Sequence, residues 1–131
     1  PYIVDVNEDG TPEIVLGNDI FGIVNNALIR RVTGTPIAFT GATGSGSATG
    51  TPLDVVVVDI LKDKPGKEIV YGSRVYSADL TAGTMTVERD LSAFPNVSVT
   101  SDDSGSTAVA DMDLDGDLDI YLLNHLLRSI L

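Results

Sequence analysis

Residues 111–123 of this chain read DMDLDGDLDIYLL, an acidic segment that runs directly into an apolar one. Counted from Asp111, aspartates stand at positions 1, 3, 5, 7 and 9, and Gly116 stands at position 6. Calcium takes six to eight oxygen ligands at about 2.3–2.6 Å, and alternate residues of a tight loop can direct oxygens at one centre. We therefore expect a Ca²⁺ site formed by the side chains of Asp111, Asp113 and Asp115, the backbone carbonyl of Asp117 and the carboxylate of Asp119.

Two alternatives compete with this interpretation. The first is an acidic turn that binds no metal. It is disfavoured because two like charges about 4 Å apart repel by roughly 4 kcal/mol at an effective dielectric near 20. The second is an EF-hand, which requires a bidentate glutamate at position 12, where this chain has Leu122. Gly116 fits the tight loop because glycine takes positive φ without steric cost.

The same pattern occurs near the start of the chain, between Asp5 and Glu13. Oxygen-bearing residues again stand at positions 1, 3, 5, 7 and 9, and Gly10 stands at position 6. The expected ligands are Asp5, Asn7, Asp9, the carbonyl of Thr11, and Glu13. Asparagine replaces one carboxylate here, so we expect weaker calcium binding than in the later loop, because affinity follows ligand charge.

A third, altered copy lies between Asp59 and Glu68. The two acidic residues are nine steps apart instead of eight, Leu61 stands at position 3, and the loop contains three lysines. No Ca²⁺ is expected there. We hypothesise that the lysine ammonium groups supply the positive charge that calcium supplies in the other two loops. A lysine-rich exposed turn without that role is the open alternative.

Composition limits the classes of function. The 131 residues are 43% apolar and 5% aromatic, with thirteen glycines and no cysteine. The length suits one ordinary domain, and the turn-rich composition favours an all-β chain. A net charge of −11 repels nucleic acids and anionic membranes, and no apolar run is long enough for a membrane span. The lack of cysteine excludes disulfides and thiolate chemistry.

The spacing of the three copies indicates the architecture. They start at residues 5, 59 and 111, so the repeats are 54 and 52 residues long, and each has room for four short strands. Such periods are typical of propeller blades. We expect a partial β-propeller of about two and a half four-stranded antiparallel blades. The blades are residues 1–52, with a glycine- and threonine-rich loop over Gly34–Pro52, residues 53–106, and residues 107–131, where Asn124–Leu131 depart from the pattern.

The motif itself resembles a known family. Segments 107–120, 12–17 and 67–79 are similar to the FG-GAP or VCBS repeat of integrin α-subunit propellers and of many secreted bacterial proteins. The resemblance implies a propeller whose Ca²⁺ loops lie between the first two strands of a blade and stabilise it. It also implies a secreted or cell-surface location. Completing a ring would need further blades of the same protein, which we favour, or other copies of the chain.

These patterns predict a binding or adhesion scaffold, not an enzyme. The only histidine, His125, lies outside the repeat, and the paired carboxylates are expected to be bound to calcium. The loops Gly34–Pro52 and Ser92–Ser106 are the expected contacts for a protein or glycan partner. Two alternatives stay open: a propeller module of a carbohydrate-active enzyme such as a polysaccharide lyase, and a self-assembling extracellular subunit.

Overall fold

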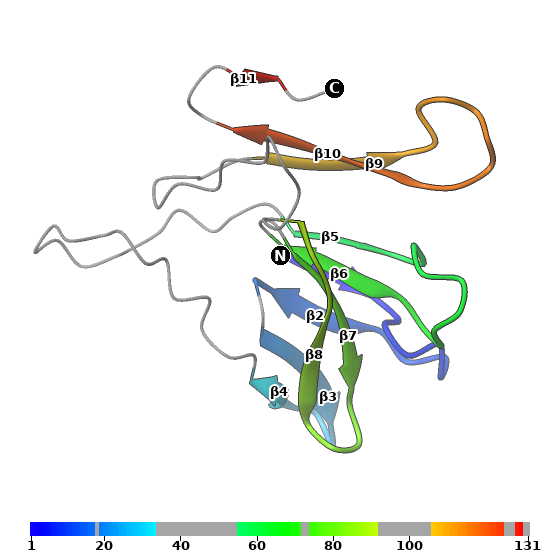
Figure 1. Cartoon of the computed structure of the whole chain (residues 1–131). Coiled ribbons are helices and arrows are strands. Elements are labelled where there is room, and N and C mark those ends of the chain that lie inside the picture. The colour runs from blue at the N-terminus through cyan, green and yellow to red at the C-terminus, as the bar shows by residue number, and fades with distance from the viewer. Residues whose placement is uncertain (18, 34–54, 72–73, 92–105, 125–127, 130–131) are drawn as a thin grey trace, which may run out of the picture.

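The computed structural model describes residues 1–17, 19–33, 55–71, 74–91, 106–124 and 128–129. Most of the two loops expected to contact partners, together with His125, lies outside these ranges. The described chain forms three antiparallel sheets, which confirms the all-β class and the four-stranded units (Figure 1). No helix in the described part is long and apolar enough to cross a membrane.

The first two sheets each contain four strands in sequence order. Sheet 1 consists of β1 (Tyr2–Val4), β2 (Glu13–Leu16), β3 (Asp19–Val24) and β4 (Ala27–Thr33). Sheet 2 consists of β5 (Val55–Val58), β6 (Glu68–Tyr71), β7 (Arg74–Asp79) and β8 (Thr84–Asp90). Asn25 and Asn26 have φ values of 51° and 60° in the β3–β4 turn, the left-handed conformation that a two-residue hairpin turn requires.

The third sheet contains β9 (Ser106–Ala110), β10 (Asp119–Asn124) and β11 (Arg128–Ser129). The short strand β11 pairs antiparallel with the end of β10, where Asn124 lies opposite Arg128. The sequence analysis did not expect residues 124–131 to continue the blade. The structure therefore adds a third strand there, because backbone pairing over two residues needs no alternation of apolar and polar side chains.

Sheets 1 and 2 repeat each other in detail. In each, the pairing of the third with the fourth strand contains a β-bulge, where the register shifts between Ile20 and Phe21 in sheet 1 and between Val75 and Tyr76 in sheet 2. The extra residues, Arg31 and Glu88, are on the fourth strands. Counted on the third strands, the two register shifts are 55 residues apart (75 − 20), which matches the spacing of Glu13 and Glu68 at the starts of β2 and β6. The repeat seen in the sequence is thus a repeat of three-dimensional structure.

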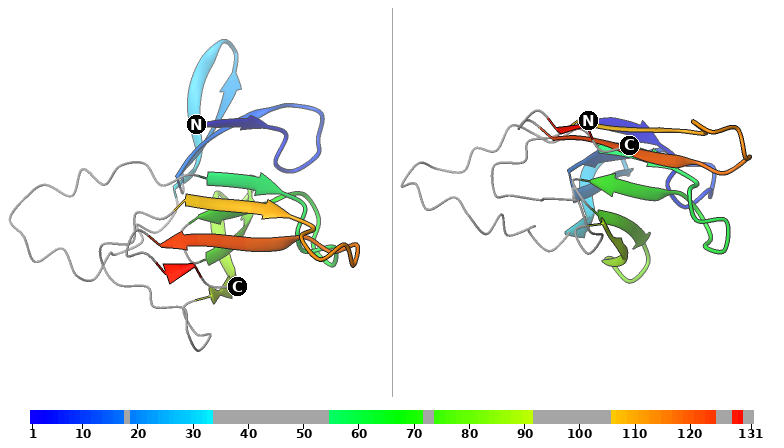
Figure 2. Two further views of the ribbon diagram at one scale, coloured as in Figure 1. Left: turned by 90° about the horizontal axis from the view of Figure 1, so that it is seen from above. Right: turned by 45° about the horizontal axis from the view of Figure 1, so that its top comes forward.

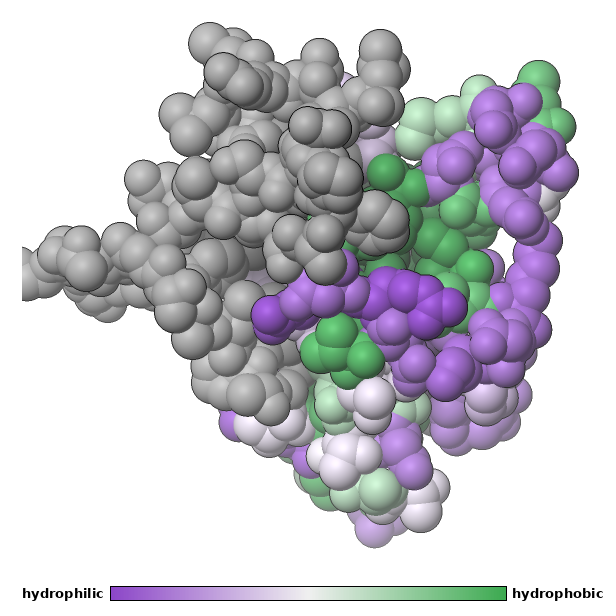
Figure 3. All heavy atoms as spheres, viewed as in Figure 1, coloured by the Kyte–Doolittle hydropathy of each residue, from purple (hydrophilic) through white to green (hydrophobic). Residues whose placement is uncertain are grey.

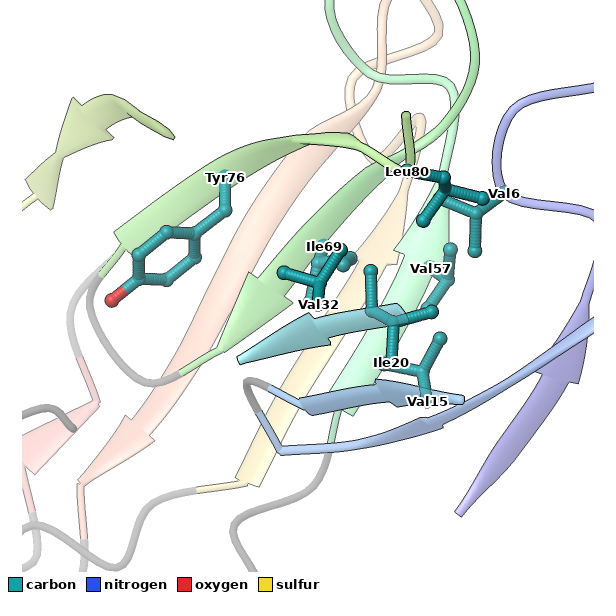
Figure 4. Close-up of a cluster of buried hydrophobic side chains, with 8 residues drawn as sticks. All are labelled: Val6, Val15, Ile20, Val32, Val57, Ile69, Tyr76 and Leu80. Atoms are coloured by element: carbon teal, nitrogen blue, oxygen red, sulfur yellow. The ribbon is translucent and has the colours of Figure 1, made fainter. Parts of the chain in front are cut away.

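The core lies between these two sheets (Figure 4). Val15, Ile20 and Val32 of sheet 1 meet Val57 and Ile69 of sheet 2, with Tyr76 and Leu80 in the same cluster. Burying one such aliphatic side chain stabilises a fold by roughly 1.5–3 kcal/mol. The first strands of the sheets are neighbours, since β1 contacts β5 and β5 contacts β9. Within the described ranges the sheets stack without closing a ring.

Candidate metal-binding loops

Three loops that each join the first two strands of a sheet lie at one end of the molecule (Figures 1 and 2). They are residues 5–12 in sheet 1, 59–67 in sheet 2 and 111–118 in sheet 3, called here the first, middle and third loops. The surface at this end is mostly hydrophilic (right-hand edge of Figure 3). The repeat of the sheets therefore brings the three copies of the motif together.

The third loop is folded around the carboxylate of Asp111. Its two oxygens accept hydrogen bonds from the backbone N–H groups of Asp115 (3.1 Å) and Gly116 (3.0 Å). Gly116 has φ 95° and Leu114 has φ 63°, so the chain turns twice through the left-handed region. Asp111, Asp113 and Asp115 each bring one carboxylate oxygen within 4.8 Å of the other two. This exposed group could hold a metal ion, and it unites the three side chains expected as ligands.

The other two expected ligands of the third loop lie outside that group. Asp119 is half-buried, and its Oδ2 accepts a hydrogen bond from the Met112 N–H at 2.9 Å. The side chain of Asp117 turns to Lys62, with 3.0 Å between Oδ1 and Nζ. Only the backbone carbonyl of Asp117 was expected to bind metal. The contact of the side chain with Lys62 does not involve that carbonyl oxygen.

The first loop repeats this geometry with different residues. The Asp5 oxygens accept hydrogen bonds from the N–H groups of Asp9 (3.1 Å) and Gly10 (2.7 Å). Left-handed residues again occupy positions 4 and 6, with φ 60° at Glu8 and 90° at Gly10. The Asn7 amide donates to Asp9 Oδ2 at 2.9 Å, and this bond, with one from the Thr11 N–H, lowers the pKa of Asp9.

Glu13 follows the first loop, at the start of β2. It is buried, and its Oε2 accepts a hydrogen bond from the Val6 N–H at 3.0 Å. Burial raises the pKa of Glu13 because the charged form loses hydration. In the middle loop, Glu68 Oε2 likewise accepts hydrogen bonds from the backbone N–H groups of Ile60 (3.0 Å) and Leu61 (2.9 Å).

The acidic residue at the end of the motif therefore has a role that the sequence analysis missed. In all three repeats its carboxylate accepts hydrogen bonds from the backbone where the chain leaves the first strand. The signal was present in the sequence, because Glu68 is retained in the middle loop although the ligand pattern there is lost. A carboxylate retained where Leu61 replaces a ligand and the spacing has changed indicates a structural use.

The lysines of the middle loop contact the two flanking loops. Lys67 Nζ donates to the Asp5 carbonyl (3.2 Å) and to Glu8 Oε1 (2.8 Å). Lys62 Nζ donates to the Gly116 carbonyl (3.0 Å) and to Asp117 Oδ1. These hydrogen bonds raise the pKa values of both lysines. Their positive charge thus acts on the neighbouring acidic loops, whereas the hypothesis placed it within the middle loop itself.

The third lysine, Lys64, has a different partner. Its Nζ lies 2.9 Å from Glu88 Oε2, and Glu88 Oε1 also accepts a 2.6 Å hydrogen bond from the Ser77 hydroxyl. These two contacts, with that of Ser77 the stronger, lower the pKa of Glu88. Lys64 therefore ties the middle loop to the outer strand of its own sheet.

Glycine allows the middle and first loops to pack closely. Gly66 has φ 83°, and a Cβ added there would lie 2.7 Å from the Val6 carbonyl oxygen. That same oxygen accepts a 2.7 Å hydrogen bond from the Lys67 N–H. Side chains larger than hydrogen would push the loops apart, so Gly66 fixes how closely sheet 2 approaches the first loop.

Comparison with known proteins identified no relative of this chain. No protein-family model, curated protein or solved structure matches this chain. The assignment of function therefore depends on the geometry of the loops and sheets.

Proposed function

We propose that this chain is a calcium-stabilised β-propeller segment of FG-GAP or VCBS type, from a secreted or cell-surface protein, that acts as a binding or adhesion scaffold. The observation that carries the proposal is the match between the first and third loops. They begin 106 residues apart (111 − 5), yet both fold around the first aspartate with the same two backbone hydrogen bonds.

Calcium is the ion that suits these loops best. Their expected ligands are oxygen atoms, which fits a large hard cation, whereas Mg²⁺ demands near-ideal octahedral geometry and retains most of its water. Two Ca²⁺ ions would offset four of the eleven net negative charges. The proposed ligands are Asp5, Asn7, Asp9, the Thr11 carbonyl and Glu13 for one ion, and Asp111, Asp113, Asp115, the Asp117 carbonyl and Asp119 for the other.

The metal would act on structure. Each loop joins the first two strands of a sheet, so an ion bound there would fix the end at which three sheets meet. Carboxylates bound to calcium are poor general bases, and the proposal assigns no catalytic residue. Extracellular modules commonly bind calcium with dissociation constants of roughly 10⁻⁴–10⁻³ M, a range that fits secretion. The proposed partners are further blades, in the same protein or in other copies, and a protein or glycan ligand.

Thermal unfolding tests the proposal. Calcium that binds only the folded chain at 100 times its dissociation constant adds about 2.7 kcal/mol of stability, so Tm should rise with Ca²⁺ and fall with a chelator. Asp113→Asn should reduce this rise because it removes a charged ligand. Ser77→Ala is the matched control, since Ser77 lies in sheet 2 away from both acidic loops, and its rise with Ca²⁺ should equal that of the wild type. Equal Tm values with calcium and with chelator would contradict the proposal.

A further inference from the structure

One face of sheet 1 is apolar and open to solvent. Strand pairing places Ile3, Ile14 and Phe21 opposite one another across β1, β2 and β3, and Ile23 opposite Leu28 farther along the same face. Ile3 is 73% exposed, Ile23 60% and Leu28 61%. Arg30 lies over the Phe21 ring at the outer edge, 5.4 Å from its centroid. Soluble chains seldom leave so many neighbouring aliphatic side chains uncovered.

The corresponding face of sheet 2 is buried. Val57, Ile69 and Tyr76 pair across β5, β6 and β7 as Ile3, Ile14 and Phe21 do in sheet 1, and their exposed fractions are 5%, 0% and 5%. They are covered by the opposite face of sheet 1, which carries Val15, Ile20 and Val32. The register shift at the same place in both sheets shows that their third and fourth strands pair in the same way. The open face of sheet 1 therefore has apolar side chains at the positions through which sheet 2 packs on its neighbour.

The other end of the stack offers the complementary face. In sheet 3, Ala108 pairs with Tyr121, and these residues stand 106 positions after Tyr2 and Val15, which pair in sheet 1. The Val15 face is the one that sheet 2 covers. In sheet 3, Ala108 and Ala110 on that face are exposed and Tyr121 is half-buried. Over β9 and the start of β10, sheet 3 thus leaves open the face that corresponds to the one sheet 2 covers in sheet 1.

We propose that copies of this chain associate head to tail, with the open face of sheet 1 in one copy packed on the open face of sheet 3 in the next. The interface would repeat the packing of sheet 2 on sheet 1. Such a heterologous contact joins two different surfaces, so it builds rings when the rotation closes and open stacks when it does not.

Calcium should control this association, a step that rests on the proposed function. Within one chain, the lysine-bearing middle loop lies between the two acidic loops and contacts both. At the interface between copies, the third loop of one copy would adjoin the first loop of the next, and neither loop contains a lysine. Like charges would then oppose the contact. Bound Ca²⁺, or salt that screens charges beyond about 10 Å at 0.1 M, would remove that opposition.

Sedimentation velocity over a concentration series tests the proposal on the whole chain. In Ca²⁺ the weight-average mass should rise about twofold or more with concentration, and in chelator at low salt it should stay that of one chain. Association in chelator at high salt would support the face contact even if the chain bound no calcium. A single-chain mass under all of these conditions would overturn the inference and leave the metal proposal intact.

Substitutions on the open faces of sheets 1 and 3 test whether these two faces form the contact. Ile23→Glu and Ala108→Glu should each abolish association, because each places a charge on one of the two faces. Thr86→Glu, at an exposed position of β8 that pairs with Ser77, is the control and should associate like the wild type. Mixing Ile23→Glu with Ala108→Glu should restore a dimer and nothing larger, since each retains the face that the other lacks. Failure of the mixture to dimerise, with circular dichroism showing both folded, would overturn the head-to-tail arrangement.

Discussion

Lys62 Nζ lies 3.0 Å from Asp117 Oδ1 although the two residues are 55 positions apart in the chain. Lys67 makes the equivalent contact on the other side, with Glu8. The middle loop has therefore lost its metal ligands and gained two cations, one for each acidic neighbour. The lysine contacts link the three loops into one charge network.

The lysine contacts predict unequal effects of substitution. Lys67→Met should lower Tm more than Lys62→Met, because the Lys67 side chain is less exposed than that of Lys62. Each lysine also donates to a backbone carbonyl, but the contact of Lys67 with Asp5 is part-buried, whereas that of Lys62 with Gly116 is exposed. Both losses should shrink at high salt, as expected for surface ion pairs. Thermal unfolding in chelator at two ionic strengths measures this. Equal Tm values for the two variants at low salt would count against the network.

The close approach at Gly66 predicts a large effect from one methyl group. Gly66→Ala should destabilise the fold by about 1–3 kcal/mol, because the residue has φ 83° and the new Cβ would meet the Val6 carbonyl oxygen at 2.7 Å. Gly10→Ala is the control, since it has a similar φ but no atom within 4 Å of the added Cβ. Urea unfolding of both variants separates backbone strain from collision. A Gly10 variant as unstable as the Gly66 variant would exclude the collision.

The buried carboxylate of Glu68 predicts a difference between two substitutions. Glu68→Ala should cost about 1–3 kcal/mol for each backbone N–H left without an acceptor, here those of Ile60 and Leu61. Glu68→Gln retains an oxygen that can accept these hydrogen bonds, so it should be milder. Chemical denaturation in chelator gives both values. An equal loss of unfolding free energy in Glu68→Gln and Glu68→Ala would contradict this role of the carboxylate.

Glu88 predicts part of the pH dependence. Its pKa in the folded chain lies below the ordinary 4.5, so the folded state binds its proton less readily than the unfolded state does. The stability it contributes is fully present above pH 4.5 and is lost as pH falls through the lowered pKa. Glu88→Gln should flatten this acid limb of the stability curve. An unchanged limb in the variant would show that other carboxylates produce it.

Much of the fold could be read from local patterns. The repeated Asp, Gly and acidic positions predicted the first and third loops. The contacts of Lys62 and Lys67 could not be read in this way, because they join residues that become neighbours only when the sheets stack. The hydrogen bonds of Glu13 and Glu68 were missed for a related reason, since an acidic residue at a ligand position has the same sequence signal whether it binds metal or backbone.

Isothermal titration calorimetry with Ca²⁺ tests the central claim most directly, that the first and third loops each hold one calcium ion. The account predicts saturable binding of about two ions per chain, with dissociation constants of roughly 10⁻⁴–10⁻³ M. The stoichiometry should fall to about one in Asp113→Ala, which removes a side-chain ligand of the third loop and keeps the first loop unchanged. A chain that gives no saturable heat, or an Asp113→Ala variant that binds as the wild type does, would contradict it.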